Sequence, residues 1–194
     1  MGDEPGWGTK FFVGGFFFFI PGLHIFSLGY LLQYAQRIRH HNELDLPEWR
    51  EWGRLFKDGL RMLVVWVIFF LVPVLIGLGL TFAYDQSVPA ILGYLNLAWS
   101  FTAVGWLVGC YFYMAALYRF VAVNSLDALL DLRTIWRMAF AMRWQLALPV
   151  LVFTGLFTLF WQIYGLVFFM GFLILTAYSS LNYVLMERAA GIHR

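Results

Sequence analysis

His24 is the residue in this sequence whose chemistry is hardest to ascribe to packing alone. It follows the Pro21-Gly22 pair, inside a run rich in phenylalanine. A proline interrupts a helix, and the backbone carbonyls that it leaves unpaired need hydrogen-bond donors, which a neutral imidazole can supply. Imidazole is also an axial ligand of tetrapyrrole metals, and phenylalanine rings pack well against a flat macrocycle. We favour the capping role and keep a bacteriochlorophyll-type pigment held by His24 as the alternative; the sequence itself requires no cofactor.

The other reactive residue types do not form a catalytic or metal-binding pattern. His40 and His41 are adjacent, so on a helix their side chains diverge. The sequence has no His-Glu-x-x-His pair, Walker loop or G-x-S-x-G elbow. Its long apolar runs also lack Asp, Glu, Lys and Arg, the groups that proton relays and ion-coupled transporters need at membrane depth. We therefore predict a protein that is not an enzyme and has no metal site.

The composition places these residues in a membrane protein. Apolar residues make up 62% of the 194 residues and charged residues only 12%, with a mean hydropathy of +0.74. The only cysteine, Cys110, lies inside an apolar run, which indicates a small buried hydrophobe and excludes an intramolecular disulfide. The net charge of +2 is too small to favour nucleic acid, so we expect contact with anionic lipid headgroups and no nucleic-acid partner.

The uncharged runs predict four transmembrane helices, because each is close to the roughly 20 residues that cross a bilayer. The predicted spans are residues 62–84, 90–118, 144–163 and 166–187. The last two come from one uncharged run that must fold back near Gln162. The predicted fold class is therefore an all-α integral membrane protein.

The first apolar segment, residues 11–37, is broken by Pro21-Gly22. Residues 11–20 alone would reach only about 15 Å, roughly half of the hydrocarbon core. We favour a re-entrant hairpin, with a single kinked span as the alternative.

Basic residues give the orientation. Twelve of the 13 Lys and Arg residues lie in three tracts, residues 37–61, 119–143 and 188–194, and the exception is Lys10. Basic residues in short loops stay on the cytoplasmic side. The sequence thus predicts a multi-pass protein of a prokaryotic inner membrane with a cytoplasmic C-terminus.

The first two basic tracts resemble one another at an offset of 82 residues. Arg37 matches Arg119, and Arg61 matches Arg143. Because two predicted spans separate the tracts, both face the same side, which indicates a parallel internal repeat.

Each tract also predicts a cytoplasmic amphipathic elbow helix, over residues 47–61 and 125–143. Aromatic and basic residues at helical spacing would contact lipid headgroups or a protein partner, and the plain alternative is a connector between spans. The candidate interface residues are Trp49, Arg50, Trp52, Arg54, Trp136 and Arg137.

Several short motifs resemble an uncharacterised multi-spanning membrane family of bacteria and archaea, known only as a domain of unknown function. They cover residues 7–60: Trp7-x-x-Lys10, Gly14-Gly15, Ile20-Pro21, Leu28-Gly29-Tyr30, Leu46-Pro47-Glu48-Trp49, Trp52-Gly53 and Asp58-Gly59-Leu60. The resemblance implies a helical membrane protein with a broken first segment and no activity to transfer. His24 departs from it, because members often carry Asn there.

Aromatic residues number 40, more than a small bundle can bury, so partners within the membrane are expected. We predict a non-enzymatic accessory or scaffolding subunit of a larger membrane complex, for which a photosynthetic or respiratory assembly is the first candidate. The alternative is a small-solute or lipid transport protein built on the parallel repeat.

Overall fold

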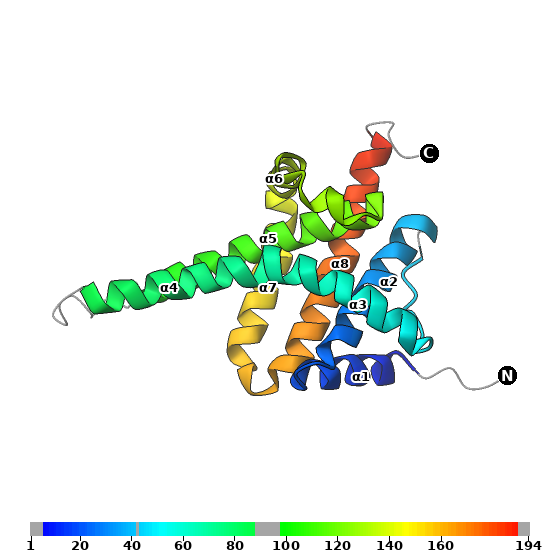
Figure 1. The fold of residues 1–194 in the computed structure, drawn as a ribbon, viewed down its shortest axis with the longest axis horizontal. Helices are drawn as coiled ribbons and strands as arrows, with labels where there is room; N and C mark the ends of the chain where they lie inside the picture. Colours follow the sequence, from blue (N-terminus) through cyan, green and yellow to red (C-terminus); the bar gives the residue numbers. More distant parts are fainter. Residues whose placement is uncertain (1–5, 42, 88–97, 190–194) are drawn as a thin grey trace.

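The computed structural model describes residues 6–41, 43–87 and 98–189, and these residues form helices joined by turns and irregular segments, with no strand among them (Figure 1). The all-α fold class is thus confirmed. The helices are α1 (Trp7–Phe19), α2 (His24–His41), α3 (Trp52–Trp66), η1 (Val67–Leu71), α4 (Val72–Ser87), α5 (Ala98–Val123), η3 (Leu126–Leu129), α6 (Leu132–Ala141), α7 (Arg143–Leu159), η4 (Trp161–Ile163) and α8 (Tyr164–Ala189).

Within residues 6–41, 43–87 and 98–189, three helical stretches are long and apolar enough to cross a membrane: Trp52–Gln86, Trp99–Val123 and Trp161–Ala189. A fourth is present if α6 and α7, which meet at a bend of 80°, count as one span. α7 alone has 17 residues, or about 25 Å of helix. The predicted crossing over residues 144–163 corresponds to α7 and the 3-10 turn η4.

The N-terminal segment is broken where the sequence predicts it, between α1 and α2. Gly22 takes a φ of +92°, a left-handed conformation that glycine adopts without strain. The turn lies beside the start of α8, because the Tyr164 hydroxyl donates to the carbonyl of Phe19 at 3.4 Å. α1 has 13 residues and α2 has 18, or about 20 Å and 27 Å of helix, and the choice between a re-entrant hairpin and a kinked span remains a prediction.

The first amphipathic helix differs from its prediction at both ends. α3 begins at Trp52 and not at Pro47, because Glu51 has a φ of +55° and Pro47 is held by a hydrogen bond from Tyr30 to its carbonyl at 2.8 Å. At its other end α3 continues through the π-helical turn η1 into α4, so there is no elbow between the helix and the predicted span. The wider turn ends two residues before Pro73, which has no N–H to donate to the preceding turn.

The second amphipathic helix is an elbow, but a shorter one than residues 125–143. Asp131 accepts a hydrogen bond from the Thr134 N–H at 3.2 Å and caps α6, which therefore begins at Leu132. At the other end Met142 leaves the helical region (φ −91°, ψ 2°), and the chain turns by 80° into α7.

The hydrophobic core lies among α2, α5 and α8, where Tyr30, Tyr113 and Phe172 are fully buried. α4 and the first half of α5 stand apart from it as a helical arm, at the left of Figure 1. Within this arm Gly77 and Gly105 let the two backbones approach closely, and the hydroxyls of Thr81 and Thr102 lie 2.8 Å apart. The arm is largely uncovered, since large apolar side chains such as Ile76, Phe82 and Trp99 are each more than half exposed.

The C-terminal ends of α2, α5 and α8 are joined by polar and aromatic contacts. Arg39 pairs with Glu187 at 3.3 Å and lies over the Tyr118 ring at 5.1 Å. Tyr118 stacks on Tyr183 at 4.8 Å, and the Tyr183 hydroxyl donates to Met138 of α6. Residues of both basic tracts thus lie at the same end of the molecule as the last turns of α8.

Candidate amphiphile-binding groove

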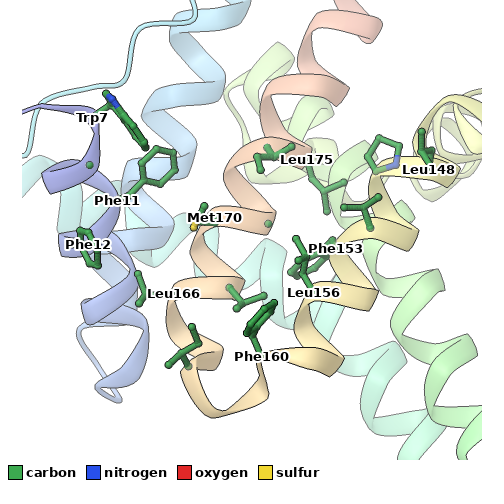
Figure 2. Close-up of a pocket in the computed structure, with 17 residues that line it drawn as sticks. Trp7, Phe11, Phe12, Leu148, Phe153, Leu156, Phe160, Leu166, Met170 and Leu175 are labelled. Atoms are coloured by element: carbon green, nitrogen blue, oxygen red, sulfur yellow. The ribbon is translucent and has the colours of Figure 1, made fainter.

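An apolar groove lies between α1 on one side and α7 and α8 on the other (Figure 2). It has a volume of about 770 Å³, within the range of ligand sites. Trp7 lies toward one end and Phe160 toward the other. Its lining is formed by Trp7, Gly8, Phe11, Phe12, Leu148, Pro149, Val152, Phe153, Leu156, Phe160, Ile163, Leu166, Val167, Met170, Gly171, Ile174 and Leu175. None of these side chains is charged, so the groove fits a hydrocarbon.

Glycines allow the helices that form the groove to pack closely against one another. A Cβ at Gly14 would overlap the Phe169 ring, and one at Gly15 would overlap Leu166, so these two positions let α1 lie directly on α8. On the other wall, Gly171 accommodates the Phe153 ring of α7. The Gly14-Gly15 pair therefore has a structural reason in this chain, which is the close approach of two helices.

A polar hollow adjoins the apolar groove at Trp7, which lines both. This polar hollow has a volume of about 570 Å³ and is lined by Gly6, Trp7, Lys10, Arg37, Leu44, Asp45, Leu46 and Glu48. It brings together α1, the end of α2 and the extended segment before α3. Apolar and polar volumes that share a wall match the two parts of an amphiphile.

Lys10 lines the polar hollow and is buried, with 8% of its surface exposed. Its ammonium donates to the Leu46 carbonyl at 3.0 Å, and its own carbonyl accepts the Trp49 indole N–H at 3.1 Å. These two bonds anchor α1 to the segment that follows α2. An ammonium has three donors, so two remain for a ligand.

The other charged residues of the polar hollow differ in how far they are already paired. Glu48 pairs with Arg50 at 2.6 Å. Within the described part of the chain, neither Arg37 nor Asp45 belongs to an ion pair. Among the described residues, the hollow thus offers one cation and one carboxylate that form no ion pair, together with the buried ammonium of Lys10.

His24 lies outside both volumes, at the start of α2. Its Nδ1 accepts a hydrogen bond from the Gly22 N–H at 3.1 Å, and its ring lies 6.4 Å from that of Trp66. The imidazole therefore caps the Pro21-Gly22 break, as we favour from the sequence, although it accepts a hydrogen bond where we expected it to donate one. The pigment ligand remains a prediction.

The predicted interface residues separate into two groups. Trp49 faces inward: its ring stacks on Tyr30 at 4.3 Å, so it is not placed on the same helix face as Trp52. Trp52 and Trp136 are exposed, by 47% and 61%. The basic members are Arg50, which pairs with Glu48, Arg54, which pairs with Glu51 and Asp58, and Arg137, which is exposed. None of the exposed members lines the groove.

Sequence reasoning missed Trp7, Lys10 and Arg37 as site residues. A signal was present, because Lys10 is the only basic residue outside the three tracts and stands three positions after Trp7, on the same face of a helix. The sequence does not predict that residues 43–48 return to this face of α1, because that segment has no periodicity.

Comparisons with known proteins address the family and not the activity. No curated protein and no solved structure shows a significant match to the chain. One family profile, described as a protein of unknown function (DUF4013), matches residues 12–177. The match contains most of the apolar groove, together with Arg37, Asp45 and Glu48 of the polar hollow, and it confirms the expected uncharacterised family. The chain therefore belongs to the DUF4013 family of proteins of unknown function.

Proposed function

We propose that this chain is a non-enzymatic, multi-pass membrane protein that binds one lipid molecule and holds it in the groove between α1 and α7–α8. The observation that carries this proposal is the shared wall at Trp7, where a wholly apolar volume adjoins a charged one. An aqueous solute would find no polar partner in the groove. A lipid acyl chain would find there the same environment that it leaves in the bilayer.

The similarity between the groove and the bilayer interior indicates what the groove adds to ordinary lipid contact. Moving an acyl chain from the bilayer into the groove gains little, because lipid tails are as apolar as leucine side chains. Retention must then come from the headgroup and from shape. This supports a protein that positions a lipid, as a lipid transporter does, and it makes the polar hollow the determinant of residence time.

The proposed orientation puts the polar hollow at the cytoplasmic face of a prokaryotic inner membrane. Basic loops favour that face, and Lys10 and Arg37 line the hollow. The Arg39–Glu187 pair supports a cytoplasmic end of α8. A thiol introduced at Arg188 in a Cys110→Ser background should react only from the cytoplasm.

The test uses vesicles of phosphatidylethanolamine and phosphatidylglycerol (3:1) containing the full chain and a trace of phosphatidylethanolamine spin-labelled on its acyl chain. A held lipid gives a motionally restricted component in the electron spin resonance spectrum. Val152→Trp fills the groove from α7 and should remove most of this component. The matched control is Leu151→Trp on the same helix, because Leu151 is 59% exposed, against 52% for Val152, but does not line the groove.

If Val152→Trp and Leu151→Trp give the same restricted component as the unmodified chain, the lipid contacts belong to the general surface and the proposal fails. A loss confined to Val152→Trp supports it.

A second candidate function, an accessory subunit of a larger membrane assembly such as an energy-transducing complex, is favoured by the helical arm. Leu75, Ile76, Phe82 and Trp99 are each more than half exposed on it. An uncovered apolar arm that stands apart from the core is suited to packing between other membrane helices. Elution mass in mild detergent separates the candidates: a large co-purifying complex favours the subunit, and a free monomer favours the lipid-binding protein.

A further inference from the structure

We infer that the polar hollow selects lipids with a zwitterionic headgroup that ends in a primary ammonium, such as phosphoethanolamine. This inference rests on the proposed function, since the acyl chain of the same lipid would lie in the apolar groove. It assigns the phosphate to Lys10 and Arg37 and the ammonium to Asp45. All three residues line one hollow that meets the groove at Trp7.

The phosphate assignment follows from the two cations. Lys10 is fixed by its bond to the Leu46 carbonyl and has two donors left. Arg37 lies in no ion pair within the described residues and carries a guanidinium fork, which matches phosphate oxygens in pairs. A buried ammonium and a guanidinium that line the same hollow favour an anion, because charge-assisted hydrogen bonds strengthen as water leaves.

The ammonium assignment follows from the carboxylates. Glu48 is engaged by Arg50 at 2.6 Å, which leaves Asp45 as the acceptor for a ligand cation. A primary ammonium can donate hydrogen bonds to Asp45 while it neutralises the carboxylate. A trimethylated ammonium carries charge but no donor, and a phosphoglycerol headgroup carries no positive charge at all.

The hollow presents both signs of charge to a headgroup. With Glu48 paired to Arg50, Lys10 and Arg37 contribute two positive charges and Asp45 one negative charge. A headgroup with both signs of charge leaves no group of the hollow unpaired. An anionic headgroup would satisfy the cations and leave Asp45 repelled.

The experiment is native mass spectrometry of the full chain, delipidated in detergent and mixed with equal amounts of phosphatidylethanolamine, phosphatidylcholine and phosphatidylglycerol with identical acyl chains. We expect phosphatidylethanolamine to be bound about tenfold more than either competitor, the effect of one charge-assisted hydrogen bond. Asp45→Asn should abolish this preference, Asp45→Glu should retain it, and Arg37→Gln should lower the binding of all three lipids. The matched control is Glu43→Gln, an exposed carboxylate outside the hollow, which should behave as the unmodified chain.

Equal binding of the three lipids, or an unchanged preference in Asp45→Asn, would overturn the headgroup inference. If Val152→Trp still reduces the binding of every lipid in that case, the groove and the proposed function stand. If Val152→Trp leaves lipid binding unchanged, the proposed function itself fails.

Discussion

The two basic tracts begin and end with arginines at matching positions, yet the chain takes different paths through them. In the first, α3 continues through η1 into α4 as one helical stretch of 35 residues. In the second, α6 ends at Ala141 and the chain turns by 80° into α7. Matching arginines at the ends of a tract therefore do not determine the direction of the chain. The packing of the helix within each tract determines it.

The first path is fixed by a close crossing of α2 and α3. A Cβ at Gly29 would overlap the Leu55 carbonyl, and one at Gly59 would overlap the Ile25 carbonyl, so each glycine admits the backbone of the other helix. α6 has no such crossing at the corresponding place. The residue 82 positions after Gly59 is Ala141, which is exposed. α6 is instead fixed at its N-terminus, by Asp131.

The largest effect should come from breaking the α2–α3 crossing. Gly59→Val forces a side chain against a backbone carbonyl that cannot move aside, which should cost about 3 kcal/mol of unfolding free energy. Ala141→Val at the corresponding position should cost less than about 0.5 kcal/mol. Unfolding of both variants in mixed micelles, followed by circular dichroism, measures the difference. Equal losses would show that the two tracts are held in the same way.

A smaller effect is expected from removing the cap that starts α6. Asp131→Ala deletes the hydrogen bond to the Thr134 N–H and the contact with Arg119 at 3.4 Å. Thermal unfolding should occur about 3 °C lower, the usual scale of one lost cap in a chain of this size. Asp127→Ala, within the preceding 3-10 turn, is the control and should lower the midpoint less.

The pH dependence of stability also tests the Asp131 cap of α6. Hydrogen bonds from Thr134, and then the charge of Arg119, hold the pKa of Asp131 below its ordinary value. A carboxyl with a lowered folded pKa contributes stability above the unfolded pKa of about 3.9 and loses it as the pH falls through the folded value. The melting difference between the unmodified chain and Asp131→Asn should therefore be constant near neutral pH and shrink as the pH falls below the unfolded value and through the folded pKa of Asp131. A difference that grows with acidity would contradict the assignment.

The smallest effect is expected at the Pro21-Gly22 turn between α1 and α2. The amide oxygen of His24→Asn can accept the Gly22 N–H in place of the imidazole nitrogen, so unfolding and lipid binding should be unchanged. An absorption band of the purified protein that disappears on this change would instead make His24 a pigment ligand.

The sequence predicts most of the fold because uncharged runs and charge tracts are strong signals in membrane proteins. It locates the Pro21-Gly22 break, the turn before α8 and the membrane-length helices. It fails where tertiary contacts decide: Pro47 suggests a helix start, but the Tyr30 hydroxyl bond to its carbonyl and the left-handed Glu51 keep residues 47–51 out of α3. The repeat remains a prediction.

The candidate site was less predictable than the fold. The sequence predicts that Trp49 is an interfacial residue beside Trp52. In the structure Trp49 faces inward, because its ring stacks on Tyr30 and its indole N–H donates a hydrogen bond to the Lys10 carbonyl. The groove depends on α1 lying against α8, residues more than 140 positions apart in the sequence, as the Phe19–Tyr164 contact illustrates. Local patterns carry no information about such a pairing.

The most direct test of the lipid-binding account is photocrosslinking in vesicles of phosphatidylethanolamine and phosphatidylglycerol (3:1), with a diazirine at the acyl-chain end of phosphatidylethanolamine. The account places the headgroup at the Trp7 end, so crosslinks should concentrate at the far end of the groove, on Leu156, Phe160 and Leu166, and should disappear in Val152→Trp. Crosslinks spread evenly over the exposed residues of the α4–α5 arm and the groove, and unchanged by Val152→Trp, would contradict it.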